Sequence, residues 1–396
     1  MQPLFSIVLI AEFLLMVTTL IADYLFDGQQ LLENQPISFD GNEIVALDVI
    51  EGADVQIFEG ILVPGFIDVQ VNGGGGVLFN HDTSLQTLEK MVQAHAKFGS
   101  TSLLPTLITS DINTLHQASN TISKAILAET PGIIGVHFEG PHLSTVKKGI
   151  HSSSHIRKLS DEELAIYCRN DLGIKIVTLA PENVSVEDIQ TLVAHDVRVC
   201  LGHSNASFEQ TLSALDAGAT GFTHLFNAMS GLDSREPNMV GAALYDAQSW
   251  YGLILDGHHV HPATAKVAYK AKSSGKMMLV SDAMSTIGSE QSAFEFDGHE
   301  ITLVGDKLAS KTGQLAGSAL DMITAVNNAK SMLNISLEES LRMASLYPTQ
   351  FLNSSQYGCL KVGNRANFTL ISNEKNCPHK VTSTWIEPEH VFKAEA

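Results

Sequence analysis

The hydrophobic and polar positions divide the chain into parts with different periods. Residues 16–60 carry short runs of alternating character, such as TTLIADYLF, EIVALDV and DVQIF, separated by Gly, Asn and Asp. A two-residue period predicts β-strands, and the turn residues between the runs predict a small antiparallel sheet. From residue 61 onward the pattern changes to an apolar run followed by an amphipathic helix, repeated along the chain. That alternation is typical of βα units in a parallel sheet.

Eight apolar segments after residue 60 are expected to form the strands of that sheet. They are residues 61–71, 101–108, 132–140, 174–182, 198–204, 221–228, 251–260 and 276–284. Eight βα units predict an α/β fold, a (β/α)8 barrel with its active site at the carboxyl ends of the strands. We place this barrel at residues 61–354. The segment FEFDGHEITLVGDKLA then predicts a hairpin, and residues 355–396 return to β character, so the two ends of the chain can pair into one small sheet.

The composition fits a folded protein that acts on small molecules. Of the 396 residues, 44% are hydrophobic and 17% are charged, which leaves enough apolar material for a sizeable core. The formal net charge is −19, whereas nucleic acids and anionic membranes select for clustered Lys and Arg. We therefore expect neither of these partners, although a few local cations would suffice for a small anionic substrate.

The cysteines indicate a reducing compartment. Cys168, Cys200, Cys359 and Cys377 are widely spaced and form no CxxC pair. Neither a zinc knuckle nor a disulfide framework is therefore expected. We expect a cytoplasmic protein.

The apolar run at residues 3–15 raises the question of a leader. No Lys or Arg precedes Lys90, and no Ala-x-Ala site follows the run, so a signal peptide is not expected. Glu12 interrupts a run that is too short to cross a bilayer. The following VTTLIADYLFDG reads as an ordinary first strand. We therefore expect residues 1–15 to be a non-native or disordered extension outside the fold.

Three residues of metal-binding types fall at the ends of predicted strands. Glu139 ends the third strand in HFEGPH, His203 ends the fifth in LGHSN, and His224 ends the sixth in FTHLFNAM. Barrel geometry brings these strand ends to one rim. One carboxylate, two imidazoles and a water make an open site for a catalytic divalent metal, commonly zinc. A single His at such a position more often caps a strand by hydrogen bonding, so it is the set of three that favours a metal.

Asp282 ends the eighth predicted strand, in LVSDAM, and would reach the same rim. A carboxylate there can take a proton from a metal-activated water and return it to a leaving amine. The alternative is that Asp282 caps the segment that follows, as isolated Asp residues often do. Its position opposite the expected metal favours catalysis.

Several basic residues near the strand ends are candidates for binding an anionic substrate. His151 follows the basic turn KKGIH, and Arg235 and His259 lie near the ends of the sixth and seventh strands. A guanidinium matches the oxygens of a phosphate group, although an exposed Arg in a loop is usually only solvated. We interpret Lys147 and Lys148 as a solvated pair.

With these residues placed, the sequence from Thr18 to the C-terminus resembles the N-acetylglucosamine-6-phosphate deacetylases of the amidohydrolase superfamily. The motifs that carry the resemblance are PGFIDVQVNGGGG, HFEGPHLSTVKKGIH, LGHSNA, THLFNAM, REP, DGHHV, VSDAM and LAGSAL, in the family's order and spacing. Each motif alone is weak, but the ordered set is highly specific. The resemblance implies a barrel with a small β-sandwich domain formed from both termini, working as a homodimer.

The resemblance also implies roles for individual residues. The metal ligands correspond to Glu139, His203 and His224. The catalytic acid and base corresponds to Asp282, and a histidine that polarises the acetyl carbonyl corresponds to His151. The positions that match the sugar-phosphate site are Ile150, Asn227, Ala228, Arg235, His259, Leu315, Ala316 and Gly317. Ile150 would make its contact through the backbone, and Arg235 would reach into the site of the neighbouring subunit.

The end of the first barrel strand departs from the wider superfamily. Many members carry His-x-His there to hold another metal, whereas this chain has Gln70 and Asn72. Amide side chains are poor ligands beside imidazole. We therefore interpret Gln70 and Asn72 as a vestigial second-metal position and expect one divalent ion per subunit, with Zn²⁺ as the expected metal.

Together these features predict hydrolysis of N-acetyl-D-glucosamine 6-phosphate to D-glucosamine 6-phosphate and acetate, in amino-sugar catabolism. A metal-activated water would attack the acetyl carbon, with Asp282 as the base, and the metal and His151 would stabilise the oxyanion. One alternative is another amidohydrolase, such as an N-acyl amino acid deacylase or a cyclic amidase, which would differ in substrate profile. The other is a barrel that lost catalysis and serves as an assembly scaffold, which would release no acetate.

Overall fold

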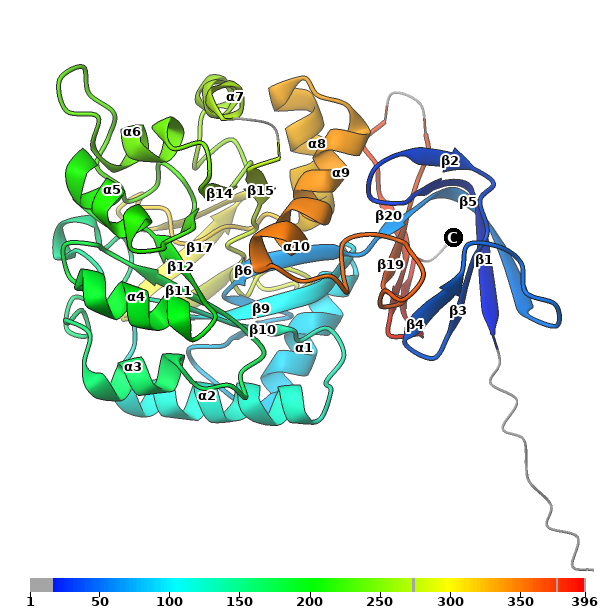
Figure 1. Cartoon of the computed structure of the whole chain (residues 1–396), viewed down its shortest axis with the longest axis horizontal. Helices are drawn as coiled ribbons and strands as arrows, with labels where there is room; N and C mark the ends of the chain where they lie inside the picture. The colour runs from blue at the N-terminus through cyan, green and yellow to red at the C-terminus, as the bar shows by residue number, and fades with distance from the viewer. Residues whose placement is uncertain (1–16, 273–274, 375–376, 395–396) are drawn as a thin grey trace, which may run out of the picture.

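The computed structural model describes residues 17–272, 275–374 and 377–394, so the expected extension at residues 1–15 lies outside the described residues. Figure 1 shows a large barrel domain beside a smaller β domain, and both ends of the described chain lie in the smaller domain. Among the described residues, no helix is both long enough and apolar enough to cross a membrane.

The smaller domain is one eight-stranded sheet built from both ends of the chain. Its strands are β1 (Thr18–Phe26), β2 (Leu31–Glu33), β3 (Ile37–Asp40), β4 (Glu43–Ala46), β5 (Asp54–Pro64), β19 (Phe368–Ile371), β20 (Val381–Ile386) and β21 (Glu389–Lys393). They follow the order β21-β20-β19-β5-β1-β3-β4, and β2 pairs with β1. The sheet is mixed, because β1 pairs with β5 in parallel, which corrects the expected antiparallel arrangement. The backbone N–H of Asp54, the first residue of β5, donates a hydrogen bond to the carbonyl oxygen of Val17, just before β1. The two strands therefore begin side by side and run in the same direction.

This sheet folds over on itself to enclose its own core. The rings of Phe39 in β3 and Phe368 in β19 lie 5.3 Å apart, although β1 and β5 separate their strands within the sheet. The backbone of Ile44 in β4 also bonds to Asn364 and Gly363, which lead into β19. The two halves of the sheet therefore face each other as the layers of a small sandwich.

The larger domain contains the expected barrel of eight parallel strands. These are β6 (Phe66–Val71), β9 (Ser100–Ile108), β10 (Gly135–Glu139), β11 (Ile174–Leu179), β12 (Val197–Leu201), β13 (Gly221–Phe222), β14 (Trp250–Leu253) and β15 (Met277–Leu279). Consecutive strands in this series are neighbours in the sheet. A parallel bridge between Val71 and Ala283, with a 3.0 Å bond from the Asp282 amide to the Gln70 carbonyl, joins the first strand to the segment after the last.

The first expected barrel strand, residues 61–71, is divided between the two domains. Residues up to Pro64 belong to β5 of the small sheet, and β6 begins at Phe66. Gly65 lies between them, where a β-carbon would come within 2.0 Å of the Thr101 hydroxyl oxygen. The apolar pattern runs through both strands because both are buried at this point, so hydrophobic periodicity does not mark the boundary.

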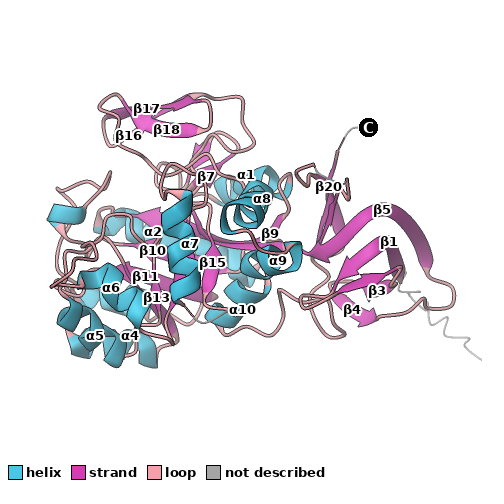
Figure 2. Cartoon of the chain, turned by 90° about the horizontal axis from the view of Figure 1, so that it is seen from above, coloured by secondary structure: helices cyan, strands magenta, loops and turns pink. Residues whose placement is uncertain are grey.

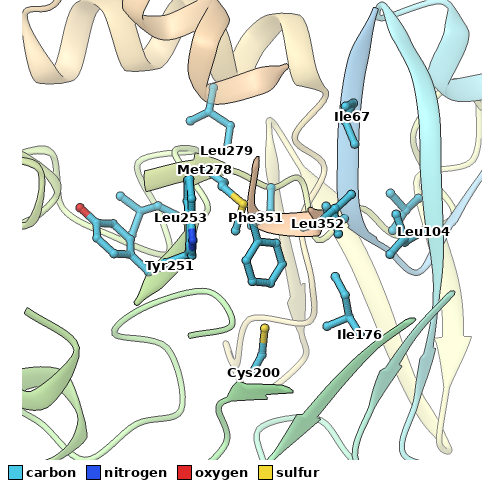
Figure 3. Close-up of a cluster of buried hydrophobic side chains, with 14 of the residues drawn as sticks. Ile67, Leu104, Ile176, Cys200, Tyr251, Leu253, Met278, Leu279, Phe351 and Leu352 are labelled. Atoms are coloured by element: carbon cyan, nitrogen blue, oxygen red, sulfur yellow. The ribbon is translucent and has the colours of Figure 1, made fainter. Parts of the chain in front are cut away.

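Helices surround the barrel and close one end of it. They are α1 (Leu85–Ala96), α2 (Ile112–Leu127), α3 (Asp161–Tyr167), α4 (Val186–Ala194), α5 (Phe208–Asp216), α6 (Asn238–Tyr245), α7 (Pro262–Ala271), α8 (Met322–Leu333), α9 (Leu337–Ala344) and α10 (Leu346–Leu352). Phe351 of α10 points into the buried cluster with Met278, Cys200 and Ile176 (Figure 3). It also lies close to Gly221, the first residue of β13, so α10 closes the end of the barrel opposite the carboxyl ends of the strands.

A separate three-stranded sheet stands near the other end of the barrel. It consists of β16 (Ala293–Phe296), β17 (His299–Val304) and β18 (Lys307–Ser310), in place of the simple hairpin expected from the sequence. Figure 2 shows this meander projecting from the barrel, away from the small domain. Phe296, Ile301 and Leu308 share a core with Leu78, Met284 and other residues of the barrel loops. The meander is therefore packed beside the carboxyl ends of the strands.

Candidate active site

Four of the predicted site residues come from four different strand ends. Glu139 is the last residue of β10, His203 follows β12, His224 follows β13 and Asp282 follows β15. The last three have positive φ angles of 47°, 33° and 51°, in the left-handed region that non-glycine residues seldom adopt. Such backbone strain gathers at functional sites. All four side chains line one cavity of about 360 Å³ at this end of the barrel.

Glu139, His203 and His224 bring three ligand atoms into a small triangle. One oxygen of Glu139, Oε1, lies 3.2 Å from Nε2 of His203 and 2.9 Å from Nε2 of His224, and the two Nε2 atoms are 3.0 Å apart. Ligand atoms bound to one tetrahedral zinc ion are separated by about 3.3 Å, given metal–ligand distances near 2 Å. The triangle is therefore close to the size that a metal ion requires.

The hydrogen bonding of His203 shows that this triangle suits a cation. Nδ1 of His203 lies 2.9 Å from the carbonyl oxygen of Lys147, which can only accept, so Nδ1 carries the proton. In the neutral ring, Nε2 then presents a lone pair toward the Glu139 carboxylate, which is also an acceptor. Two acceptors facing each other fit a shared positive ion, and a carbonyl that fixes the tautomer is a common support for a metal-binding His.

The lowered pKa of Glu139 also fits a metal site formed by one carboxylate and two imidazoles. Burial alone would raise the pKa of Glu139, but the hydrogen bonds and charges of His203 and His224 hold it well below its usual value. Nδ1 of His224 has no hydrogen-bond partner among the described residues. A buried carboxylate kept ionised beside two imidazoles fits a divalent metal.

His151 lies against the same triangle. Its ring centroid is 4.3 Å from that of His203, and ligand atoms of Glu139, His151 and His203 all fall within 4.8 Å of one another. Nδ1 of His151 is 2.8 Å from the hydroxyl of Thr109. Burial, followed by the charge of His203, lowers the pKa of His151 well below its usual value. His151 is therefore a neutral imidazole at neutral pH, with one N–H group and one lone pair.

Asp282 is held by the two amides at the end of the first barrel strand. Its Oδ1 accepts a 2.6 Å bond from Asn72 and a 3.2 Å bond from Gln70. The Gln70 amide also lies 3.2 Å from both oxygens of Glu139. Burial and the charge of Glu139 raise the pKa of Asp282 to about 6, against the opposing effects of His224, His259 and Asn72. A carboxylate with such a pKa can both accept and return a proton near neutral pH.

The expected sugar-phosphate residues are placed unequally around the cavity. Those that line it are Ile150, Asn227, Ala228, His259, Leu315 and Gly317. Ala316 is buried beside them and lines a smaller adjoining pocket. Arg235 is exposed in the loop before α6 and does not line the cavity of its own chain.

Lys147 corrects one expectation from the sequence. We interpreted it with Lys148 as a solvated pair, but Lys147 lines the cavity and its carbonyl oxygen accepts the bond from His203. Its role could not be predicted from the sequence because a backbone contact leaves no mark on residue type, although Lys147 is the first residue of the KKGIH motif. Sequence reasoning also missed Thr109, Met284 and Gln314, whose proximity to the site follows from tertiary packing.

Comparisons with known proteins show the family to which the chain belongs. Residues 61–391 match the model of the amidohydrolase family. An N-acetylgalactosamine-6-phosphate deacetylase of Shewanella sp. strain ANA-3 is 46% identical over 340 residues, which cover 86% of this chain and 85% of that protein. An N-acetylglucosamine-6-phosphate deacetylase of Haemophilus influenzae is 35% identical over 315 residues, covering 78% and 82%. The crystal structure of N-acetylglucosamine-6-phosphate deacetylase from Pasteurella multocida superposes with a TM-score of 0.89 at 34% identity, covering 94% of this chain and 99% of that one.

Proposed function

This chain belongs to the amidohydrolase family, and we propose that it hydrolyses N-acetyl-D-glucosamine 6-phosphate to D-glucosamine 6-phosphate and acetate in amino-sugar catabolism. The observation that carries the proposal is the cavity in which Glu139, His203 and His224 form a metal-sized triangle beside Asp282. The activities named for the relatives from Haemophilus influenzae and Pasteurella multocida support the choice of substrate. The rest of the proposal assigns roles to the residues of this cavity.

The metal ligands would be Glu139, His203 and His224, with one ion per subunit and Zn²⁺ as the metal. A bound divalent ion would act as a Lewis acid and would lower the pKa of a water molecule. The Lys147 carbonyl would keep the His203 ring in the tautomer that leaves Nε2 free for the ion. Gln70 and Asn72 would hold no second metal, because their amide groups already bond to Glu139 and Asp282.

Asp282 would move the proton. As a carboxylate it takes a proton from the attacking water while the water oxygen forms a bond to the acetyl carbon. It then gives that proton to the nitrogen as the carbon–nitrogen bond of the amide breaks, so the products are acetate and a free amine. The bonds from Asn72 and Gln70 to Oδ1 hold the carboxylate in place.

His151 would stabilise the negative charge that develops on the acetyl oxygen. This role requires the tautomer with the proton on Nε2, in which the Thr109 hydroxyl turns from the Glu139 carbonyl oxygen and donates to Nδ1. A donor placed in this way is worth about 3 kcal/mol in comparable enzymes.

The sugar phosphate would lie along the rest of the cavity. Asn227, Ala228, Leu315 to Gly317 and the backbone of Ile150 would contact the sugar, and His259 would meet the phosphate group. Arg235 is exposed and does not line its own cavity, which suits a role at the site of a second copy. We propose a cytoplasmic homodimer in which Arg235 completes the phosphate site of the neighbouring subunit, with neither nucleic acid nor membrane as a partner.

A second candidate substrate is N-acetyl-D-galactosamine 6-phosphate. The observation that favours it is the 46% identity to the Shewanella enzyme of that name. The two sugars differ only in the orientation of one hydroxyl group, so the same metal, base and phosphate contacts would serve both. An N-acyl amino acid deacylase, a cyclic amidase or an inactive scaffold would not require a phosphate site.

The test is a substrate panel assayed for acetate and free amine. It contains both 6-phosphorylated sugars, their unphosphorylated forms and an N-acetyl amino acid. We expect a strong preference for a phosphorylated sugar, and the ratio of kcat/KM between the two epimers decides between the two candidates. Preference for the N-acetyl amino acid, or no turnover of any compound by metal-loaded enzyme, contradicts the proposal.

A further inference from the structure

Asp256, in the loop between β14 and α7, makes one hydrogen bond more than an Asp in a tight turn usually does. Oδ1 of Asp256 accepts bonds from the backbone N–H groups of His258 at 2.9 Å and His259 at 2.8 Å. Those two bonds are what an Asp or an Asn supplies in a tight turn. Oδ2 makes a third bond, 2.6 Å long, with Nδ1 of the His259 ring. The side chains of Asp256 and His259 are each 7% exposed.

This third bond determines which edge of the His259 ring faces the cavity. A carboxylate oxygen only accepts, so Nδ1 of His259 donates to Asp256 and Nε2 lies on the far side of the ring. Among the residues that the structure describes, no side chain or backbone group bonds to Nε2. His259 lines the cavity together with Asn227, Ala228 and Asp282. Its free nitrogen is therefore available to a substrate.

The same bond places a carboxylate directly beside the His259 ring. A carboxylate in contact with an imidazole stabilises the protonated form of the ring. Burial would raise the pKa of Asp256, yet the hydrogen bond and charge of His259, with the two backbone donors, hold it below its usual value. Besides the histidines, the charged residues that line the cavity are Asp282, Glu139 and Lys147. A dianion that enters beside two carboxylates needs such a cation.

We propose that Asp256 is a positioning residue that keeps the His259 ring charged and turned with its Nε2–H toward the phosphate group of the substrate. The inference rests on the proposed function, because it assumes a 6-phosphorylated sugar in the cavity. It adds a residue that does not itself line the cavity. Asp256 acts through His259, as the buried carboxylates behind many functional histidines do.

Asp256→Asn is the discriminating variant. The amide oxygen can still accept the two backbone bonds, so the turn is retained, but the negative charge and the acceptor for Nδ1–H are lost. The matched control is Asp306→Asn. It removes the negative charge of the exposed Asp306, which lies 2.8 Å from Nε2 of the neighbouring His258. Neither of these residues lines the cavity.

The first measurement compares kcat and KM for phosphorylated and unphosphorylated N-acetylhexosamine, using metal-loaded enzyme. We expect Asp256→Asn to raise KM for the phosphorylated sugar about 10-fold or more, with kcat nearly unchanged, because one charge-assisted contact weakens. Values for the unphosphorylated sugar, and all values for Asp306→Asn, should stay within about 2-fold of wild type. Equal losses on both sugars, or no loss, overturn the proposal.

The second measurement is ¹⁵N NMR of the His259 ring in the metal-loaded protein at pH 7, with and without inorganic phosphate. The proposal requires a doubly protonated ring in the wild type and a singly protonated ring in Asp256→Asn. A neutral ring in the wild type overturns it. If the wild type does not prefer phosphorylated sugars, the proposed function fails, and the NMR result still decides whether Asp256 sets the charge of His259.

Discussion

The amide of Asn72 donates a 2.6 Å hydrogen bond to the carboxylate of Asp282, across the seam where the first strand of the barrel meets the last. The bond joins a position where many amidohydrolases carry a metal-binding His to the proposed catalytic base. Gln70 makes a parallel connection, since its amide contacts both Asp282 and Glu139. The two amides thus orient the Asp282 and Glu139 carboxylates, and we propose that they do so in place of a second metal.

The first prediction concerns the number of metal ions. Because Gln70 and Asn72 use their amide N–H groups on Asp282 and Glu139, they offer only weak oxygen ligands to another ion. Active enzyme should contain about one tightly bound divalent ion per chain, as measured by elemental analysis after dialysis. A content of two ions in fully active enzyme would contradict this reading.

Asp282→Asn tests the proton-transfer role. The amide keeps the shape of the side chain but cannot act as a base, so turnover should fall at least about 100-fold while the substrate still binds. In the wild type, kcat should also decrease as the pH drops below about 6, because the raised pKa of Asp282 leaves less of the ionised form. The variant should lack this acidic limb. A near-normal rate in Asp282→Asn would reduce Asp282 to a structural residue.

Arg235→Ala tests the proposed phosphate contact from a neighbouring subunit. Loss of a charge-assisted contact should cost about 1.5 to 3 kcal/mol, or about 10- to 150-fold in kcat/KM on the phosphorylated sugar. Activity on the unphosphorylated sugar should scarcely change. Mixing Arg235→Ala with an Asp282→Asn variant should restore activity if mixed dimers form, because one site in such a dimer has both residues intact. Equal decreases in kcat/KM on both sugars would mean that Arg235 stabilises the fold or the dimer and does not bind the phosphate group.

Asp68 in β6 should make the stability of the fold depend on pH. Its Oδ1 accepts bonds of 3.3 Å from the backbone N–H groups of Gln70 and Ser281, but Oδ2 has no partner among the described residues. Burial raises the pKa of Asp68 to about 7, whereas an unfolded Asp titrates near 3.9. The folded state therefore binds the extra proton between about pH 4 and pH 7, and its stability falls as the pH rises through that window.

Asp68→Asn cannot ionise, so it should remove this contribution. Relative to wild type, the variant should gain unfolding free energy as the pH rises from about 4 to about 7, by up to about 4 kcal/mol, and the gain should level off at higher pH. Urea unfolding at several pH values measures it. A difference between the two proteins that does not change with pH would show that Asp68 keeps an ordinary pKa in the fold.

Much of the fold follows from hydrophobic periodicity combined with barrel geometry. The eight apolar segments predicted the barrel, and barrel topology alone brings the ends of distant strands, with Glu139, His203, His224 and Asp282, to one rim. The division of the first segment at Gly65 did not follow, because a strand buried in one core has the same pattern as a strand buried in another.

The contacts that support the site residues could not be predicted from the sequence for a different reason. The Lys147 carbonyl that holds His203 is a backbone group, and the parallel pairing of β1 with β5 depends on the order of strands in space. Asp256 was visible in the DGHHV motif, but only the fold shows that its second oxygen reaches the His259 ring. Residue types predict the chemistry of a site, whereas its orientation comes from contacts that residue types do not encode.

The most direct test of the proposed function measures free amine, acetate and bound metal together while the enzyme acts on N-acetyl-D-glucosamine 6-phosphate. We expect equal amounts of amine and acetate, at a rate proportional to the bound metal, and loss of both metal and activity in Glu139→Ala. Activity that survives complete removal of the metal, or a Glu139→Ala variant that keeps its metal and turns over normally, would contradict the proposed function.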